Sequence, residues 1–344
     1  MTMETALITT SRMRSFNACR RMHHLQFVLG YRAIVDREAA EFGTIGHAGL
    51  EAWWLAYAEG RELLACEEAQ AAVVKAVAAS VAKGNHLDEA TAVKADLLML
   101  GYHARWAPTM AEYEVIAVER QFEAPLPTPA GAKRVRGLKI AGKLDVLLRK
   151  RCDRTVWFCE HKFTTADLTP GSTYWARLRM DTQVSVYFEG TRVLGYEPVG
   201  CIYDVISKPL QRPLKATPPD KRKYKKGTTE LWANQREHDE TMEEFRERMM
   251  AEIVSAPEAY FLRAEVVRLE AELEESRRDT YQAALLIRET AKREWSDRNP
   301  DACFLWGRPC DFYDHCAGGV SIDDETRFKR LDNVHPELER PEAA

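Results

Sequence analysis

The amino-acid sequence predicts an α/β core with appended helices. Segments rich in alanine and leucine, which favour helices, fill much of the first third of the chain. A block of apolar, strand-like runs follows, and the composition changes to charged, helix-like segments after Pro209. With 344 residues, of which 45% are hydrophobic and 30% charged, the chain is long enough for one large domain or two ordinary ones.

The elements of the core are predicted from periodicity and turn residues. Ser11 is a suitable N-cap for a helix over 11–30, and the glycines of "FGTIGHAGLE" mark the turn into a second helix. The strands over 136–150 and 155–164 are joined by the polar segment "RCDR", which has the length of a hairpin loop. The other expected elements are helices over 46–59, 62–83, 88–106 and 175–195, and strands over 113–126 and 199–207.

The C-terminal third differs from the core in composition. A proline-rich and then strongly basic segment begins at residue 209, and we expect it to be an exposed loop. Two highly charged helices are expected over 229–254 and 258–297, and the polar tail over 321–344 is expected to be partly disordered.

The sequence shows no sign of a membrane-spanning or a secreted protein. No apolar run reaches the roughly 18 residues of a membrane-spanning helix, and the N-terminus lacks the apolar stretch of a secretory signal. We therefore expect a cytoplasmic protein without a membrane partner. The net charge of −4 excludes no partner, because a local basic surface is compatible with a nearly neutral total.

Ionisable residues end the expected strand over 155–164, which begins with the apolar run "VWFC". Glu160 and Lys162 are two residues apart, so a strand places both on one face, and the hairpin can bring Asp145 beside Glu160. Two carboxylates can hold one or two hard divalent cations, and a lysine can neutralise charge on a phosphate. The set therefore suits hydrolysis of a phosphodiester. For Glu160 and Lys162 taken alone, a solvated strand end with an ion pair is the alternative.

The arrangement of "GKLDVLL", a hairpin and "VWFCEHK" resembles the signature of the PD-(D/E)XK nuclease superfamily. The resemblance implies a restriction-endonuclease-like core, in which a mixed central sheet is flanked by helices. It also implies catalytic roles for Asp145, Glu160 and Lys162 and binding of Mg²⁺ or Mn²⁺ by the two carboxylates. The carbonyl of His161 is a further oxygen ligand in this interpretation.

Two other motifs resemble the RecB-like branch of this superfamily. "GTIGHAGLEAWW" is similar to its glycine-led helix, which implies that His47 is a metal ligand and that Glu51, on the same helical face, supports the site. "DTQVSVYF" is similar to its Q-x-x-x-Y motif, which implies that Gln183 and Tyr187 shape the site and contact DNA. Without the resemblance, both segments would be ordinary amphipathic helices, with His47 in the core.

Four of the eight cysteines lie at the two ends of the chain, and they are Cys19, Cys303, Cys310 and Cys316. The pattern resembles the iron–sulfur ligands of the CRISPR-associated RecB-like exonuclease family and of the AddB nuclease domain, and it implies a structural [4Fe–4S] cluster. The first two C-terminal cysteines are further apart here than is usual in those families. Zinc is the rival occupant, although the tight C-x₂₋₄-C pairs of structural zinc sites are absent from the sequence. The remaining cysteines are interpreted as small buried hydrophobes, and they are Cys66, Cys152, Cys159 and Cys201.

One basic segment and one basic surface are candidates for DNA contact. The first consists of Lys221, Arg222, Lys223, Tyr224, Lys225 and Lys226. Its cations can bind backbone phosphates and its tyrosine can stack on an unpaired base, while a solvated flexible loop is the alternative. The second consists of Arg12, Arg14, Arg20, Arg21, Arg177 and Arg179. No feature indicates base-specific readout, so we expect DNA binding to be sequence-tolerant.

Together the motifs predict a metal-dependent DNA nuclease, with exonuclease action in DNA recombination, repair or phage DNA processing, in a prokaryotic or phage-infected cell. The alternative is a DNA-binding subunit of a recombination or CRISPR-adaptation complex whose nuclease site is weak or unused. A recombination or replication protein is the expected protein partner. The expected organisation is a nuclease core over 1–208, a basic loop and charged helices over 209–300, a cysteine strap over 301–320 and a polar tail over 321–344.

Overall fold

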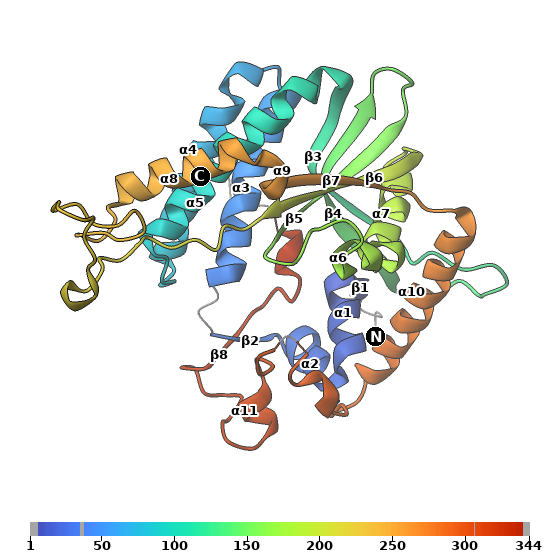
Figure 1. Cartoon of the computed structure of the whole chain (residues 1–344). Coiled ribbons are helices and arrows are strands. Elements are labelled where there is room, and N and C mark those ends of the chain that lie inside the picture. The colour runs from blue at the N-terminus through green and yellow to red at the C-terminus, as the bar shows by residue number, and fades with distance from the viewer. Residues whose placement is uncertain (1–5, 35–37, 306, 340–344) are drawn as a thin grey trace.

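A six-stranded mixed sheet forms the centre of the computed structural model, which describes residues 6–34, 38–305 and 307–339 (Figure 1). Its strands are β1 (Ala6–Ile8), β3 (Tyr113–Pro125), β4 (Leu138–Lys150), β5 (Val156–Thr164), β6 (Pro198–Ser207) and β7 (Phe261–Val266). β3 pairs antiparallel with β4 along its whole length, so the antiparallel strand β5 and the parallel strand β1 share the other edge of β4. β6 then pairs parallel with β5 and antiparallel with β7. The predicted α/β fold with a mixed central sheet is confirmed.

Helices cover both faces of this sheet (Figure 1). The helices α3 (Glu38–Ala58), α4 (Ala65–Ala82), α5 (Glu89–Trp106) and α8 (Met242–Ser255) pack on one face. The opposite face is covered by α1 (Thr10–Ala18), α7 (Thr182–Val193) and α10 (Glu270–Thr290). Side chains of β5 alternate between the two cores, with Trp157 and Cys159 in the first and Phe158 in the second. A strand buried on both faces has to be apolar at every position, which explains the continuous run "VWFC".

The two ends of the chain form a small lobe beside the main sheet, blue and red at the bottom of Figure 1. There β2 (Tyr31–Ala33) pairs antiparallel with β8 (Phe328–Arg330), and α2 (Arg20–His23) and α11 (Tyr313–Cys316) lie nearby. A separate core of Leu25, Phe312 and Phe328 holds the lobe together. The tail that was expected to be partly disordered therefore contains β8, and a short 3₁₀ turn at Pro336–Leu338 follows.

Several expectations about helices are wrong. The turn expected at the glycines of "FGTIGHAGLE" lies inside α3, which begins at Glu38. The helix expected over 175–195 is divided into α6 (Thr173–Ala176), a 3₁₀ turn at Arg177–Met180 and α7. The helix expected over 11–30 is interrupted at Cys19, whose backbone is extended with φ −160°, and it continues as α2 and a π-helical turn at His24–Val28. Of the two charged helices expected in the C-terminal third, the first begins only at Met242. The second is replaced at its start by α9 (Pro257–Tyr260) and β7, and α10 ends at Thr290. β7 was missed because it is short and has one partner, β6, more than 50 residues earlier in the chain.

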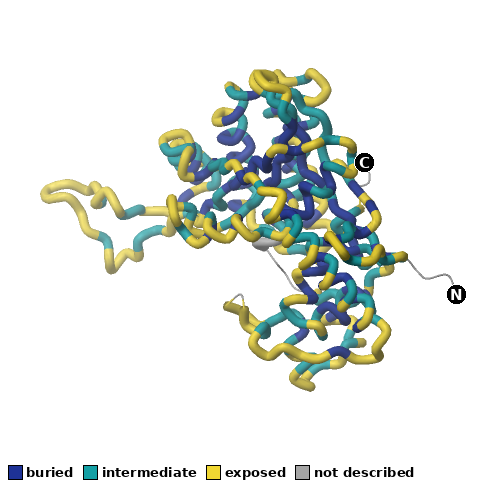
Figure 2. The backbone as a smooth tube through the Cα atoms, turned by 90° about the vertical axis from the view of Figure 1, so that its right-hand side faces the viewer, coloured by how far each residue is buried: buried dark blue, intermediate teal, exposed yellow. Residues whose placement is uncertain are grey.

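The segment between β6 and α8 projects from the body as an exposed finger, at the left of Figure 2. Its two arms meet at one isolated bridge, Tyr224 to Leu231, and a 3₁₀ turn lies at Pro219–Lys221. Among the helices of the described residues, none is long and apolar enough to cross a membrane.

Candidate functional site

The strands β4 and β5 diverge where the predicted carboxylates lie. Their pairing ends at Val146 and Cys159, one residue before Asp145 on β4 and Glu160 on β5. Beyond that point the Asp145 side chain replaces the missing backbone partner, because its Oδ2 accepts a hydrogen bond from the His161 N–H at 2.7 Å. Both carboxylates are buried, with Asp145 at 9% and Glu160 at 2% exposure. The divergence therefore leaves a polar hollow between β4 and β5.

A hydrogen-bonded chain joins Glu160 to α7. The Lys162 ammonium forms an ion pair with Glu160 Oε1 and donates to Gln183 Oε1 at 3.1 Å. Gln183 Nε2 donates to Glu160 Oε1 at 2.7 Å and to the Tyr187 hydroxyl at 3.0 Å. The other oxygen of Glu160, Oε2, is buried and has no protein partner among the described residues. The structure thus brings the four residues together and leaves one carboxylate oxygen available.

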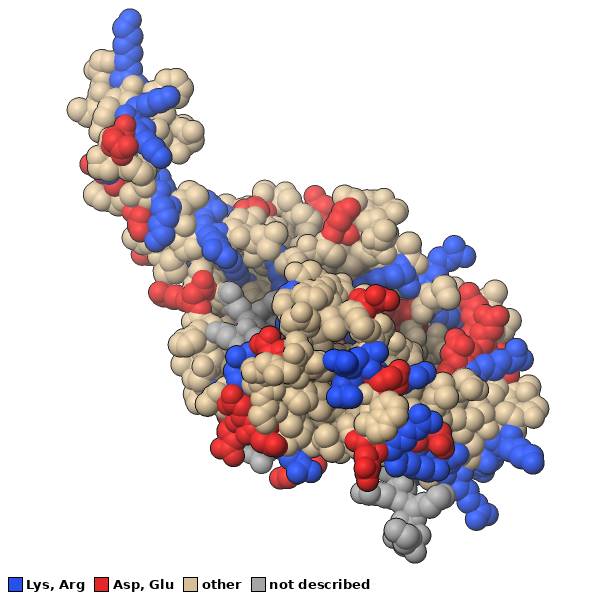
Figure 3. All heavy atoms as spheres, turned by 90° about the horizontal axis from the view of Figure 1, so that it is seen from below, with Lys and Arg blue, Asp and Glu red and all other residues tan. Residues whose placement is uncertain are grey.

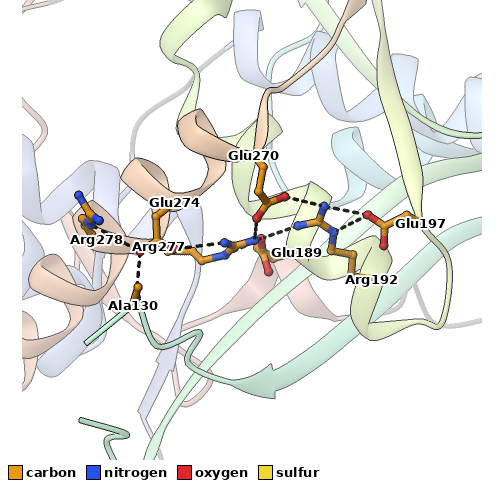
Figure 4. A network of polar contacts seen from close by, with 8 residues as sticks. All are labelled: Ala130, Glu189, Arg192, Glu197, Glu270, Glu274, Arg277 and Arg278. Atoms are coloured by element: carbon orange, nitrogen blue, oxygen red, sulfur yellow. Dashed lines mark hydrogen bonds and ion pairs between the residues drawn. The ribbon is translucent and has the colours of Figure 1, made fainter. Parts of the chain in front are cut away.

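α7, which carries Gln183 and Tyr187, is fixed by an N-cap and by ion pairs. The Asp181 side chain accepts from the Val184 N–H at 3.1 Å and begins the helix. On the outer side, Arg277 of α10 donates to Glu189 of α7 at 2.8 Å within the network of Figure 4. That network consists of Ala130, Glu189, Arg192, Glu197, Glu270, Glu274, Arg277 and Arg278.

His47 approaches the carboxylates from α3. Gly46 permits this approach, because a Cβ at that position would lie 2.2 Å from Cζ of Phe163. The His47 and Phe163 rings are 5.7 Å apart, and the His47 and His161 rings 6.4 Å. Gly46, the second glycine of the "GTIGH" motif, is thus needed because α3 packs directly against β5.

Glu119 of β3 completes this group, and sequence reasoning missed it. Ligand atoms of His47, Glu119 and Asp145 all lie within 4.8 Å of one another. Glu119 has a positive φ of 49°, which is rare for a residue with a side chain and is common at functional sites. It also forms an ion pair with Lys143 of β4. No motif marks Glu119, since its proximity arises only from the pairing of β3 with β4.

The electrostatics of the hollow favour a bound cation. Burial, together with the charge of Asp145, raises the pKa of Glu160 to about 8. Burial and the charge of Glu119 raise the pKa of Asp145 to about 7. Burial, reinforced by His161 and Lys162, lowers the pKa of His47 to about 3, so its imidazole is neutral and able to coordinate. The ammonium groups of Lys162 and Lys143, which pair with Glu160 and Glu119, offset the cost of burying these carboxylates only in part. A divalent cation would supply further positive charge, and His47, Glu119, Asp145 and Glu160 are of the right chemical types to hold one.

The hollow opens into a cleft of about 770 Å³ between α3 and α7. Arg14, Glu51 and Lys83 line the cleft together with the residues described above. The 3₁₀ turn at Pro336–Leu338 also lines it, and the Leu338 carbonyl accepts a hydrogen bond from Gln121 of β3. The C-terminal segment therefore forms part of the wall of the cleft.

The His161 side chain lies on the other face of β5. Its Nδ1 is 3.1 Å from Oδ2 of Asp204, which also contacts the Tyr102 hydroxyl at 2.6 Å and Arg263 at 3.3 Å. Cys159, His161 and Asp204 form a second close group of potential ligands. The guanidinium of Arg263 already supplies positive charge there, although His161 Nε2, Asp204 Oδ1 and Arg263 Nε have no hydrogen-bond partner among the described residues. Only the backbone carbonyl of His161 remains as a ligand for the cleft.

The four terminal cysteines converge on one small cavity in the lobe. Cys19, Cys303, Cys310 and Cys316 all line it, together with Met22 and Phe312. The Cys19 sulfur accepts from the Asn299 N–H at 3.4 Å. Among the described residues, the thiols do not form a group of three within 4.8 Å. A zinc ion with bonds of about 2.3 Å would need sulfurs roughly 3.8 Å apart.

Other cysteines and arginines depart from expectation. Cys159 and Cys201 are buried as predicted, whereas Cys152 is exposed and Cys66 half-buried.

The prediction that Arg12 contacts DNA is wrong, because its side chain is buried and donates to His23 Nε2 at 3.1 Å. Arg20 is half-exposed and pairs with Asp297 at 3.4 Å.

The basic segment over 221–226 lies on the finger, which projects with lysine and arginine side chains at the top left of Figure 3. None of its residues lines the cleft itself.

Two buried carboxylates, a histidine and a lysine thus meet where two strands of a mixed sheet diverge, and residues of these types suit hydrolysis of a phosphodiester. The model of the PD-(D/E)XK nuclease superfamily matches residues 8–317, and the chain belongs to that superfamily. No curated protein matches the chain. Among solved structures, the crystal structure of SSO0001 is similar at 14% sequence identity with a TM-score of 0.25, over 69% of this chain and 72% of that one.

Proposed function

We propose that this protein is a RecB-like, metal-dependent DNA nuclease, with exonuclease action in DNA recombination, repair or phage DNA processing. The observation that carries the proposal is the unpartnered Glu160 Oε2, which lies in one cleft with Asp145, His47 and Lys162. Superfamily membership supports nuclease chemistry, and the acidic, partly buried donor set supports a divalent cation.

His47, Glu119 and Asp145 would hold Mg²⁺ or Mn²⁺, and Glu160 would supply a further carboxylate ligand. When bound, such cations neutralise phosphate charge and acidify water. The Lys162 ammonium has three N–H donors, of which Glu160 and Gln183 use two. The third is available to orient the attacking water or a phosphate oxygen. Gln183 and Tyr187 hold Glu160 and Lys162 in position.

The four cysteines are proposed to hold a [4Fe–4S] cluster with a structural role. Their shared cavity supports a common occupant, and the sequence lacks the tight cysteine pairs that are typical of structural zinc sites. Such a cluster would tie the N-terminal helix to the C-terminal segment and close a loop of almost the whole chain. Anaerobically purified protein should be brown and contain iron and sulfide; colourless protein with stoichiometric zinc would contradict this.

The nuclease proposal is tested with end-labelled linear DNA and closed circular DNA in Mg²⁺ or Mn²⁺. Lys162→Ala should reduce cleavage of linear DNA by about 100-fold or more, since it removes a preorganised cation at the reacting phosphate. Lys139→Ala is the matched control, because that lysine lies on β4 but its side chain is 41% exposed and pairs with Glu123. Cleavage that persists in Lys162→Ala would refute the site, and cleavage of circles would refute exonuclease action.

A further inference from the structure

The finger has the construction of an ordered hairpin. Its arms are joined by backbone hydrogen bonds from Lys225 to Glu230 at 2.9 Å and from Trp232 to Lys223 at 3.0 Å. Nearer the body, the Thr217 N–H donates to the Arg236 carbonyl at 2.9 Å. The segment is therefore held in one shape, although it projects into solvent (Figure 2).

Two aromatic side chains are displayed on this hairpin. Tyr224 is 52% exposed and Trp232 is 56% exposed. The Trp232 indole Nε1 donates to the Tyr224 carbonyl at 3.2 Å, which anchors one edge of the indole to the opposite arm. An anchored indole with more than half of its surface in water offers a face for stacking without a large loss of conformational entropy.

The cations of the basic segment over 221–226 divide into two sets. Arg222 is occupied by the carbonyls of Thr217 and Glu237, each at 2.9 Å, and Lys225 pairs with Glu230 at 2.7 Å. Within the described part of the chain, no ion pair or hydrogen bond engages the remaining ammonium groups, which are those of Lys221, Lys223 and Lys226. These three lysines flank the aromatic pair and are available for an anionic ligand.

A basic groove lies at the base of the finger, beside the active-site cleft. The groove, about 860 Å³, is lined by the cations Lys94, Lys208, Arg212 and Lys215. Asp88 and Glu89 also line it, which leaves a net positive lining. Phe42 of α3 lines the groove, whereas its neighbours Glu41 and Gly43 line the cleft. The two hollows are therefore adjacent, with α3 between them.

We propose that the groove and the finger form a track for single-stranded DNA that leads to the active site. Trp232 and Tyr224 stack on unpaired bases, while Lys221, Lys223 and Lys226 bind phosphates. Stacking on an aromatic face requires a base that is not covered by its neighbours in a duplex, so the track selects single strands. This inference rests on the proposed nuclease function and names the form of DNA that the enzyme takes.

Binding is measured by fluorescence anisotropy with a labelled oligothymidylate and with a blunt duplex, in EDTA and in the Lys162→Ala background, so that cleavage does not interfere. Trp232→Ala should weaken single-strand binding by about 10-fold, because one base–aromatic stack is lost. Duplex binding should change far less. Trp295→Ala is the matched control, since Trp295 is 63% exposed but lies far along the chain from the finger, after α10.

The salt dependence provides a second readout. Replacing Lys221, Lys223 and Lys226 by glutamine should reduce the slope of log affinity against log salt by about 2, as expected for three single-strand phosphate contacts. Unchanged single-strand affinity in Trp232→Ala, or an equal loss for the duplex, would overturn the proposal. If wild-type protein cleaves no DNA, the nuclease proposal fails, whereas a selective loss in Trp232→Ala would still support the track.

Discussion

Replacing Glu160 by glutamine should stabilise the metal-free protein while it abolishes cleavage. Burial and the charge of Asp145 raise the pKa of the Glu160 carboxyl from its ordinary value of 4.5 to about 8. Across that pH range the folded protein binds a proton that the unfolded chain has released. The free energy of unfolding therefore falls as the pH rises, by about 1.4 kcal/mol per pH unit for this one group.

At neutral pH the accumulated penalty is about 3.5 kcal/mol, the product of that slope and roughly 2.5 pH units. Glutamine carries no charge at any of these pH values, so the penalty disappears. Its amide oxygen can still accept from Lys162 and Gln183, but its NH₂ group takes the buried position of Oε2, where no described residue accepts from it, and this costs about 1 to 2 kcal/mol. The net expectation for Glu160→Gln is a gain of about 1.5 to 2.5 kcal/mol.

The assay is urea unfolding in EDTA at several pH values between 5 and 8. The stability of Glu160→Gln relative to wild type should grow as the pH rises from 5 to 8, because the opposing slopes of Asp145 and His47 are common to both proteins and cancel in the comparison. Glu123→Gln, on the neighbouring strand β3 with a side chain that is 47% exposed, should behave like wild type. A Glu160→Gln protein that is less stable than wild type at neutral pH in EDTA would refute the reasoning. Added Mg²⁺ should stabilise wild type more than the variant.

Two further substitutions test how α3 and α7 are positioned. Gly46→Ala places a methyl group 2.2 Å from Phe163 and should cost about 1 to 3 kcal/mol, with impaired cleavage because His47 moves. Gly43→Ala, with nothing within 4 Å, should instead gain up to about 1 kcal/mol from helix propensity, and equal effects of the two changes would contradict the packing argument. Arg277→Met removes the central guanidinium of Figure 4 and should lower the free energy of unfolding by about 2 kcal/mol. Arg278→Met, with a side chain that is 60% exposed, should change it by less than about 0.5 kcal/mol, and denaturant melts that rank the two in reverse order would exclude a stabilising role for the network.

Local sequence determined the main strands and the residues at their ends. The apolar runs of β4 and β5 predict buried strands, and their short connection predicts a hairpin that pairs them. Asp145 and Glu160 consequently come together from spacing alone, and Lys162 follows on the same face. Gln183 and Tyr187 share a face because they are four residues apart on a helix, as the hydrogen bond between them at 3.0 Å shows. In each case the neighbours in space are also close in sequence.

Other features of the site and the fold depend on contacts between segments that are far apart in the sequence. Glu119 joins His47 and Asp145 only because β3 pairs with β4, and its positive φ depends on that surrounding structure. Burial of Arg12 and the sixth strand β7 likewise depend on segments far away in the chain.

The finger and the cysteine cavity show the same division. The basic residues over 221–226 are evident from composition, but Trp232 joins them only through the pairing of the two arms. The four cysteines are evident from their positions at the chain ends, and the packing of the lobe brings them to one cavity. The chemistry of each side chain and its spacing along one strand or helix can be determined from the sequence. Which side chains from distant segments become neighbours depends on strand register and packing, and only the tertiary structure determines these.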